Sequence, residues 1–148
     1  MTPLRTFARL SPDDCALLIR AAFLVAAIRF ALWVLPFQYL RRLLLDARLR
    51  SPSRARLRPV KSAARLAWGV RAAAHLVPGA SCLTQALALH CFLVRAGHPS
   101  TVHIGVAREP RSGFRAHAWV EHAGRPWLTA AAETARYTRL ASWGRPQA

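Results

Sequence analysis

The fold is decided by residues 80–127, ASCLTQALALHCFLVRAGHPSTVHIGVAREPRSGFRAHAWVEHAGRPW. Within this stretch the spacing of the apolar residues changes from that of a helix to that of a strand. Ser81 can cap a helix over residues 82–96, and Gly97 is a common kind of helix stop. Over residues 101–106 apolar side chains alternate with others, as they do in a half-buried strand. The stretch therefore predicts a helix followed by extended chain.

Two further strands continue from that point. The segment EPRSG, residues 109–113, has the composition of a turn, and FRAHAWVEH, residues 114–122, is typical of a second strand. Ala123 and Gly124 suit a tight hairpin into RPWLTA, residues 125–130. Strands joined by such short turns pair antiparallel, so we expect an antiparallel sheet.

Helical segments precede this stretch. Residues 11–14 are a strong helix start, with a serine cap, a proline that needs no amide hydrogen, and two aspartates at the positive end of the helix dipole. The first helix is expected to reach residue 35, before a proline, and a second to cover residues 37–50. After a linker over residues 51–59, residues 60–77 are expected to form a third helix.

Helices first and an antiparallel sheet afterwards indicate an α+β fold with a helical amino-terminal half. The chain of 148 residues has the size of one domain, and its 53% hydrophobic content supplies a core and excludes a disordered chain. We expect a helical segment over residues 1–58 and a core over residues 59–148, integrated in one domain.

The apolar run over residues 15–35 is long enough to suggest a transmembrane helix, but Arg20 and Arg29 fall inside it and point to opposite sides. Each costs about 2.5 to 3.5 kcal/mol at the middle of a bilayer, so a helix packed on its own domain or on a partner is favoured over a span. Interfacial membrane contact stays open. Residues 1–10 lack the apolar core of a signal peptide, and a cytoplasmic location is expected.

The net charge of +16 comes from 22 Lys and Arg against 6 Asp and Glu. It favours acidic partners, yet the arginines are scattered with only a mild concentration over residues 41–58, and no aromatic-interleaved basic platform accompanies them. Nucleic acid is therefore not expected as a partner. Cys15, Cys82 and Cys91 show neither the number nor the spacing of a disulfide framework or a zinc site.

Cys82 and His117 are the candidates for chemistry. A helix amino terminus and a neighbouring imidazole are common devices for activating a cysteine thiol, and Cys82 has a claim to both. The free amides of the first helical turn are also suited to hold an oxyanion. Spacing alone favours a buried structural cysteine and a strand histidine without catalytic function.

A family resemblance reverses that preference. The elements CL..ALAL from residue 82, RAGH from residue 95, IGV from residue 104 and F.AHAWVE.AGRP from residue 114 follow one another without a sizeable gap. In this combination they closely resemble the protease domain of lasso-peptide leader peptidases, the B-type maturation proteins of transglutaminase-like, papain-related fold. The strongly apolar helices expected before this stretch are similar in character to the amino-terminal part of the stand-alone members of that family.

The resemblance implies a helix packed on an antiparallel sheet and a cysteine peptidase. Cys82 would attack a peptide bond of a ribosomally made precursor peptide, with His117 as general base and then general acid. The family's partners imply a leader-recognition protein that presents the leader and an ATP-dependent macrolactam cyclase that acts afterwards. No cofactor is expected.

One departure from the family pattern concerns the acid that orients the histidine. The family places an aspartate twelve residues after the histidine, where this chain has Thr129. Glu121 lies four positions along the strand from His117, about 13 Å away by strand rise. Glu133 follows the hairpin and is able to fold back. Thr129 is therefore the third candidate catalytic residue, as an orienting hydroxyl, with a shifted acid or a degenerate, non-catalytic homologue as alternatives.

Two residues are candidates for substrate binding, Gln85 one turn beyond Cys82 and Trp119 on the strand face of His117. An exposed polar position and core packing are the respective alternatives. The remaining histidines show no ligand spacing, so no metal is expected. Three other functions stay open, namely acyl transfer to an amine, a scaffold that binds the precursor or cyclase, and a small basic membrane-associated protein.

Overall fold

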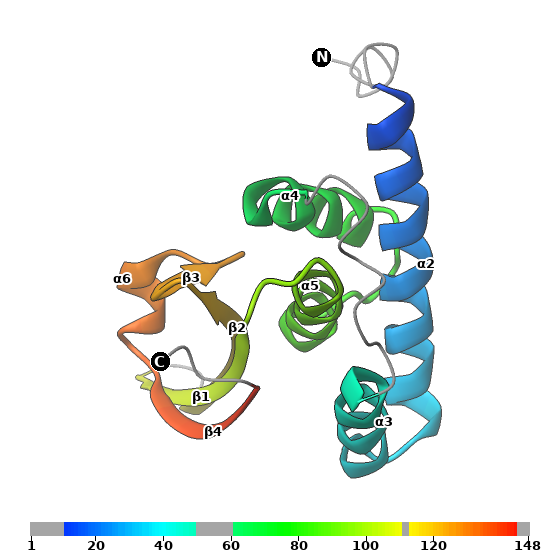
Figure 1. The fold of residues 1–148 in the computed structure, drawn as a ribbon. Coiled ribbons are helices and arrows are strands. Elements are labelled where there is room, and N and C mark those ends of the chain that lie inside the picture. The colour runs from blue at the N-terminus through cyan, green and yellow to red at the C-terminus, as the bar shows by residue number, and fades with distance from the viewer. Residues whose placement is uncertain (1–10, 50–60, 111–112, 145–148) are drawn as a thin grey trace.

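The computed structural model describes residues 11–49, 61–110 and 113–144. The expected linker over residues 51–59 and the stretch of residues 1–10 lie outside the described residues. In Figure 1 the helix α5 lies between the helix α2 on one side and a strongly curved sheet on the other. The predicted α+β class, with helices before an antiparallel sheet, is confirmed.

Four longer helices form the amino-terminal half and the centre of the molecule. They are α2 (Pro12–Val34), α3 (Phe37–Leu49), α4 (Ala63–Ala74) and α5 (Cys82–Arg95). Serine side chains cap three of them, because the hydroxyls of Ser11, Ser62 and Ser81 each accept from a backbone amide three residues later. The third helix is shorter than the predicted span of residues 60–77, since the chain turns after Ala74.

One apolar cluster joins these helices to the sheet. The inner face of α2, including Val25, packs on α4 and α5, and α5 in turn packs on β2, with Leu87 and Val120 in the same cluster. These three side chains have no exposed surface. The core therefore includes residues from both sides of the expected boundary between residues 58 and 59, and the expected domain organisation stays a prediction.

The sheet has the order β3-β2-β1-β4 and every pairing is antiparallel. Its strands are β1 (Thr101–Glu109), β2 (Gly113–His122), β3 (Arg125–Trp127) and β4 (Thr138–Gly144), with the short helix α6 (Ala131–Thr134) between the last two. The predicted hairpin between β2 and β3 is present, with φ of 54° at Ala123 and 69° at Gly124. Positive φ at both positions is the geometry of a two-residue hairpin turn.

The two faces of β2 have different surroundings. Ala118 and Val120 belong to the core cluster that includes α5. Because side chains alternate along a strand, His117, Trp119 and Glu121 leave the sheet on its other face. The sheet thus has one face toward the helices and one face that carries the polar and aromatic side chains considered next.

Helix α2 alone among the described helices is long and apolar enough to cross a membrane. This is weak evidence, because the core helix of a soluble protein passes the same criterion. Within its most apolar window 28% of residues are buried inside the domain.

Candidate active site

Cys82 is the first residue of α5, and its side chain is half-buried. The hydroxyl of the cap residue Ser81 accepts from the amide of Thr84 at 3.3 Å, and the Ser81 carbonyl accepts from the amide of Gln85 at 3.0 Å. The amides of Cys82 and Leu83 have no acceptor within the helix, because the first turn lacks preceding carbonyls. The helix start therefore offers two amide donors beside the thiol.

His117 has a partner in the segment that follows β3. The Nε2 atom of His117 lies 2.9 Å from the hydroxyl oxygen of Thr129. Leu128, just before Thr129, has φ of 70°, a backbone conformation that costs a leucine of the order of 1 to 3 kcal/mol. The chain thus adopts a strained turn at the point where it brings Thr129 back to the strand of the histidine.

Two aromatic rings pack against the imidazole of His117. The ring of His117 stacks at 6.2 Å on Trp119 and lies 5.1 Å from Tyr137, measured between ring centroids. Gly105 pairs directly with His117 across the strands, and a methyl group at Gly105 would lie 2.9 Å from Cβ of Tyr137. A glycine here therefore lets the three rings close around one another.

The surroundings favour the neutral imidazole of His117. Its pKa is lowered from 6.5, first because burial penalises the charged form and also because of the positive charge of Arg115. The carboxylate of Glu133 acts in the opposite direction and raises the pKa. Glu133 therefore contributes electrostatically at this histidine, while the hydrogen bond belongs to Thr129.

The structure brings His117 and Thr129 together, but it does not bond the thiol to the imidazole. Helix α5 packs on β2, yet within residues 61–110 and 113–144 no hydrogen bond joins Cys82 to His117. His117 also leaves β2 on the face opposite to Ala118, which contacts the helices. The Cys82–His117 pair therefore stays a prediction, and catalytic hydrogen bonds often form only once substrate is bound.

The two predicted substrate-binding residues differ in exposure. Gln85 is half-buried, and its amide nitrogen lies 3.5 Å from the carbonyl of Ala80 just before the helix, so it stays within one turn of Cys82. Trp119 is only 1% exposed. Its burial under His117 favours the core-packing alternative. Trp119 then acts on the site only indirectly, because its ring stacks on the imidazole of His117.

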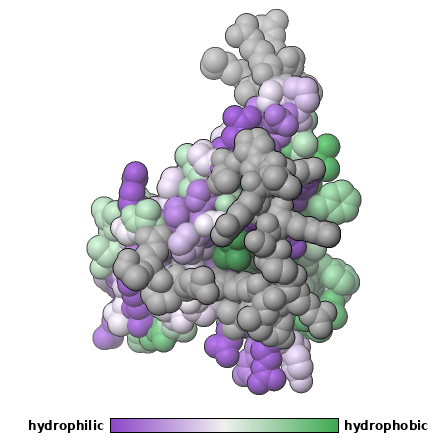
Figure 2. Space-filling view, in the orientation of Figure 1, coloured by the Kyte–Doolittle hydropathy of each residue, from purple (hydrophilic) through white to green (hydrophobic). Residues whose placement is uncertain are grey.

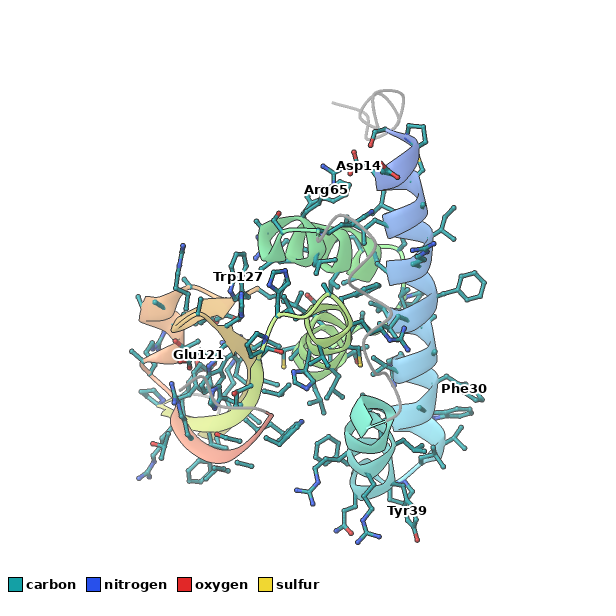
Figure 3. The ribbon with its side chains drawn as sticks, in the orientation of Figure 1. Asp14, Phe30, Tyr39, Arg65, Glu121 and Trp127 are labelled. Carbon is teal, nitrogen blue, oxygen red and sulfur yellow. The ribbon has the colours of Figure 1, made fainter. Side chains whose placement is uncertain are left out.

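A polar network that sequence reasoning missed occupies the same face of the sheet. His103 Nδ1 lies 2.6 Å from the Ser142 hydroxyl, and its Nε2 lies 3.3 Å from a carboxylate oxygen of Glu121, which also accepts from Arg139. These side chains line a cavity of about 490 Å³. Glu121, labelled in Figure 3, is thereby engaged away from His117. The only sequence signal for this network was the strand alternation of residues 101–106.

The described residues contain no group of three or more His, Cys, Asp or Glu side chains able to hold a metal ion. The expectation that no metal participates stays a prediction.

Comparison with known protein families identifies the family to which the chain is similar. A model described as the transglutaminase-like superfamily matches residues 16–142, which include most of α2 as well as the helix α5 and the strand β2 that carry Cys82 and His117. No curated protein and no solved structure matches the chain significantly.

Proposed function

The chain belongs to the transglutaminase-like superfamily, and on that premise we propose that it is a cysteine peptidase that removes the leader from a lasso-peptide precursor. The superfamily includes cysteine peptidases. The observation that carries the proposal is the 2.9 Å contact between His117 Nε2 and the Thr129 hydroxyl. It supplies an orienting partner at the position where the resembling family has its aspartate.

The tautomer required of a general base follows from this contact. If Nε2 carries the hydrogen and donates a hydrogen bond to the Thr129 hydroxyl, the Nδ1 atom of His117 is left unprotonated. Nδ1 then accepts the proton of the Cys82 thiol as the sulfur attacks the scissile carbonyl. The lowered pKa of His117 keeps the imidazole in this proton-accepting form at neutral pH.

The remaining steps use the same two side chains. The tetrahedral oxyanion accepts hydrogen bonds from the free amides at the start of α5. His117 returns its proton to the amine as the carbon–nitrogen bond breaks, which leaves a thioester on Cys82. A water molecule then gives its proton to His117 and attacks the thioester. The carbon–sulfur bond breaks, the sulfur of Cys82 recovers that proton from His117, and the leader leaves as a carboxylic acid. Gln85 is proposed to contact the peptide beside Cys82.

The proposed partners follow from the family resemblance and the charge. They are a precursor peptide, a leader-recognition protein that presents it, and an ATP-dependent macrolactam cyclase that uses the product. The reaction is proposed to take place in the cytoplasm. The net charge of +16 is suited to an acidic leader or an acidic presenting protein.

The test combines the purified full chain with a candidate precursor and its leader-recognition partner and follows peptide masses over time. The wild-type chain should release leader and core, and Cys82→Ala should release neither. Cys91→Ala is the matched control, because Cys91 lies on the same helix nine positions later, and it should retain cleavage.

Each alternative function gives a different result in this assay. A scaffold would leave the precursor uncut with both chains, and Cys82→Ala would still support the reconstituted pathway. An acyl-transfer enzyme would give products whose mass includes an added amine rather than water. Either result would replace the peptidase proposal.

A further inference from the structure

Helix α2 has a continuous apolar face that points away from the domain. We define its outer stripe as Ile19, Phe23, Phe30, Trp33 and Val34, which are spaced so that they share one side of a helix. All five are more than half exposed, and Phe23 and Trp33 reach 76%. Phe30 projects from α2 away from the other elements (Figure 3), and hydrophobic side chains follow the right-hand edge of the molecule in Figure 2.

The opposite face of the same helix is part of the core. Leu17, Ala21, Val25 and Ile28 are almost completely buried against α4 and α5. A helix that is apolar on all sides is normally covered on all sides, and soluble monomers rarely expose so large an apolar patch. Nothing in the described part of the chain covers the outer stripe, which leaves it available to a surface from outside the domain.

The exposed charges on α2 beyond its first turn and on the start of α3 are positive. Arg20 is exposed on α2 next to Ile19, and Arg41 and Arg42 are exposed on α3, the next helix. The acidic residues of α2 are confined to its first turn, where Asp14 is paired with Arg65 (Figure 3). The stripe therefore combines large apolar and aromatic side chains with Arg20 at its margin, and α3 adds two further exposed arginines.

This charge pattern decides between the candidate occupants. A second copy of the chain carries the same net charge of +16, so electrostatic repulsion opposes pairing through the stripe. An anionic lipid surface is complementary, and it attracts arginines while its headgroup region accommodates Trp and Tyr rings. Tyr39 of α3, 61% exposed, adds such a ring beyond the end of α2.

A membrane-spanning α2 does not fit the fold. Its inner face belongs to the domain core, and Arg29 packs beside the α4–α5 connection, where a side chain at Gly79 would lie 3.0 Å from its Nε atom. We propose that α2 instead lies in the plane of an anionic membrane and inserts its outer stripe into the boundary between headgroups and acyl chains.

Such docking leaves the candidate active site accessible. In Figure 1 the sheet lies on the far side of α5 from α2. His117 and Thr129 belong to that side of the molecule, so membrane contact through α2 does not cover them. The docking proposal does not depend on the proposed peptidase activity.

The experiment measures co-sedimentation of the full chain with vesicles of phosphatidylcholine alone and of phosphatidylcholine mixed with phosphatidylglycerol. The test variant combines Phe23→Ser with Trp33→Ser. The matched control combines Phe114→Ser with Leu140→Ser, because these apolar side chains are 77% and 65% exposed on the sheet instead. Circular dichroism verifies that both variants keep the wild-type fold.

We expect the wild-type chain to bind the mixed vesicles and to stay partly bound after a high-salt wash. The stripe variant should bind at least about tenfold more weakly, since each large apolar side chain contributes on the order of one tenfold factor when buried. The control should change by less than about twofold.

Three results would overturn the docking proposal. Equal binding by the stripe variant would mean that charge alone attracts the chain to lipid. Absence of vesicle binding, together with a dimer that the stripe variant abolishes, would identify a second copy as the occupant. Absence of both would mean that neither surface covers α2.

Discussion

The contact between Thr129 and His117 predicts how replacing the hydroxyl changes the titration of the imidazole. Thr129→Asp puts a carboxylate where the hydroxyl oxygen now lies 2.9 Å from Nε2. A neutral hydrogen bond contributes about 1 kcal/mol, whereas one to an ionised group contributes about 1.5 to 3 kcal/mol. The added stabilisation of the imidazolium is therefore about 0.5 to 2 kcal/mol, and the pKa of His117 should rise by about one unit.

Thr129→Val is the matched variant, because it keeps the shape of the side chain and removes the hydroxyl. It deprives the imidazole of its orienting partner without adding charge. We expect the pKa of His117 to stay below 6.5, since burial is the main cause of its lowering. In the cleavage assay Thr129→Val should lower kcat/KM by about tenfold, since the lost contact is one hydrogen bond that holds the base in position.

Proton NMR of the full chain measures these pKa values directly. The chain has 6 histidines, and the resonance of His117 is identified as the one that disappears in His117→Gln. An unchanged pKa in Thr129→Asp would refute the reasoning, because a carboxylate in hydrogen-bond contact cannot leave the imidazole unaffected. Unchanged cleavage in Thr129→Val would show that the hydroxyl does not position the base.

Three other predictions concern the same face of the sheet. Glu133→Gln should lower the pKa of His117 further, because the carboxylate of Glu133 raises it, and the same NMR titration measures the change. Gly105→Ala should lower the free energy of unfolding by about 1 to 3 kcal/mol, because its methyl group would press on Tyr137 and Trp119. Urea denaturation with an unchanged m-value measures this loss, and wild-type stability in the variant would contradict the prediction. Burial lowers the pKa of His103 and His117 below 6.5, so both stabilise the fold above that pH, and their contribution is lost as the pH falls through the lowered values. The urea midpoint should therefore fall on acidification, and less steeply in His103→Gln; an equal slope in that variant would exclude His103 as a cause.

Helix starts and the first strands were predictable because single residues specify them. The hydroxyls of Ser11 and Ser81 can satisfy a backbone amide, and both helices begin where these residues predict. The hairpin was likewise predictable from the two residues of its turn, Ala123 and Gly124. Strand β4 carries no comparable signal, because five of its seven residues are exposed and no alternation is present.

Long-range features of the site were less accessible to sequence reasoning. The positive φ of Leu128 has no sequence signal, since leucine rarely adopts it, and this turn is what returns Thr129 to His117. The sequence placed His117 and Trp119 on one face of β2, but it did not show that Ala118, on the other face, is the residue that packs toward the helices. An apolar pattern on all sides of α2 likewise did not reveal which side the domain covers.

A hydroxyl at Thr129, where the resembling family has an aspartate, is consistent with the electrostatics around His117. A carboxylate bonded to Nε2 would stabilise an imidazolium and hence a resting ion pair with a thiolate. Here burial and Arg115 lower the pKa of His117, and a hydroxyl orients the ring without opposing that effect. The arrangement therefore suits an imidazole that is neutral at rest and accepts the thiol proton only when the sulfur of Cys82 attacks. In the proposed peptidase, a presented peptide would bring the thiol of Cys82 and this neutral imidazole together.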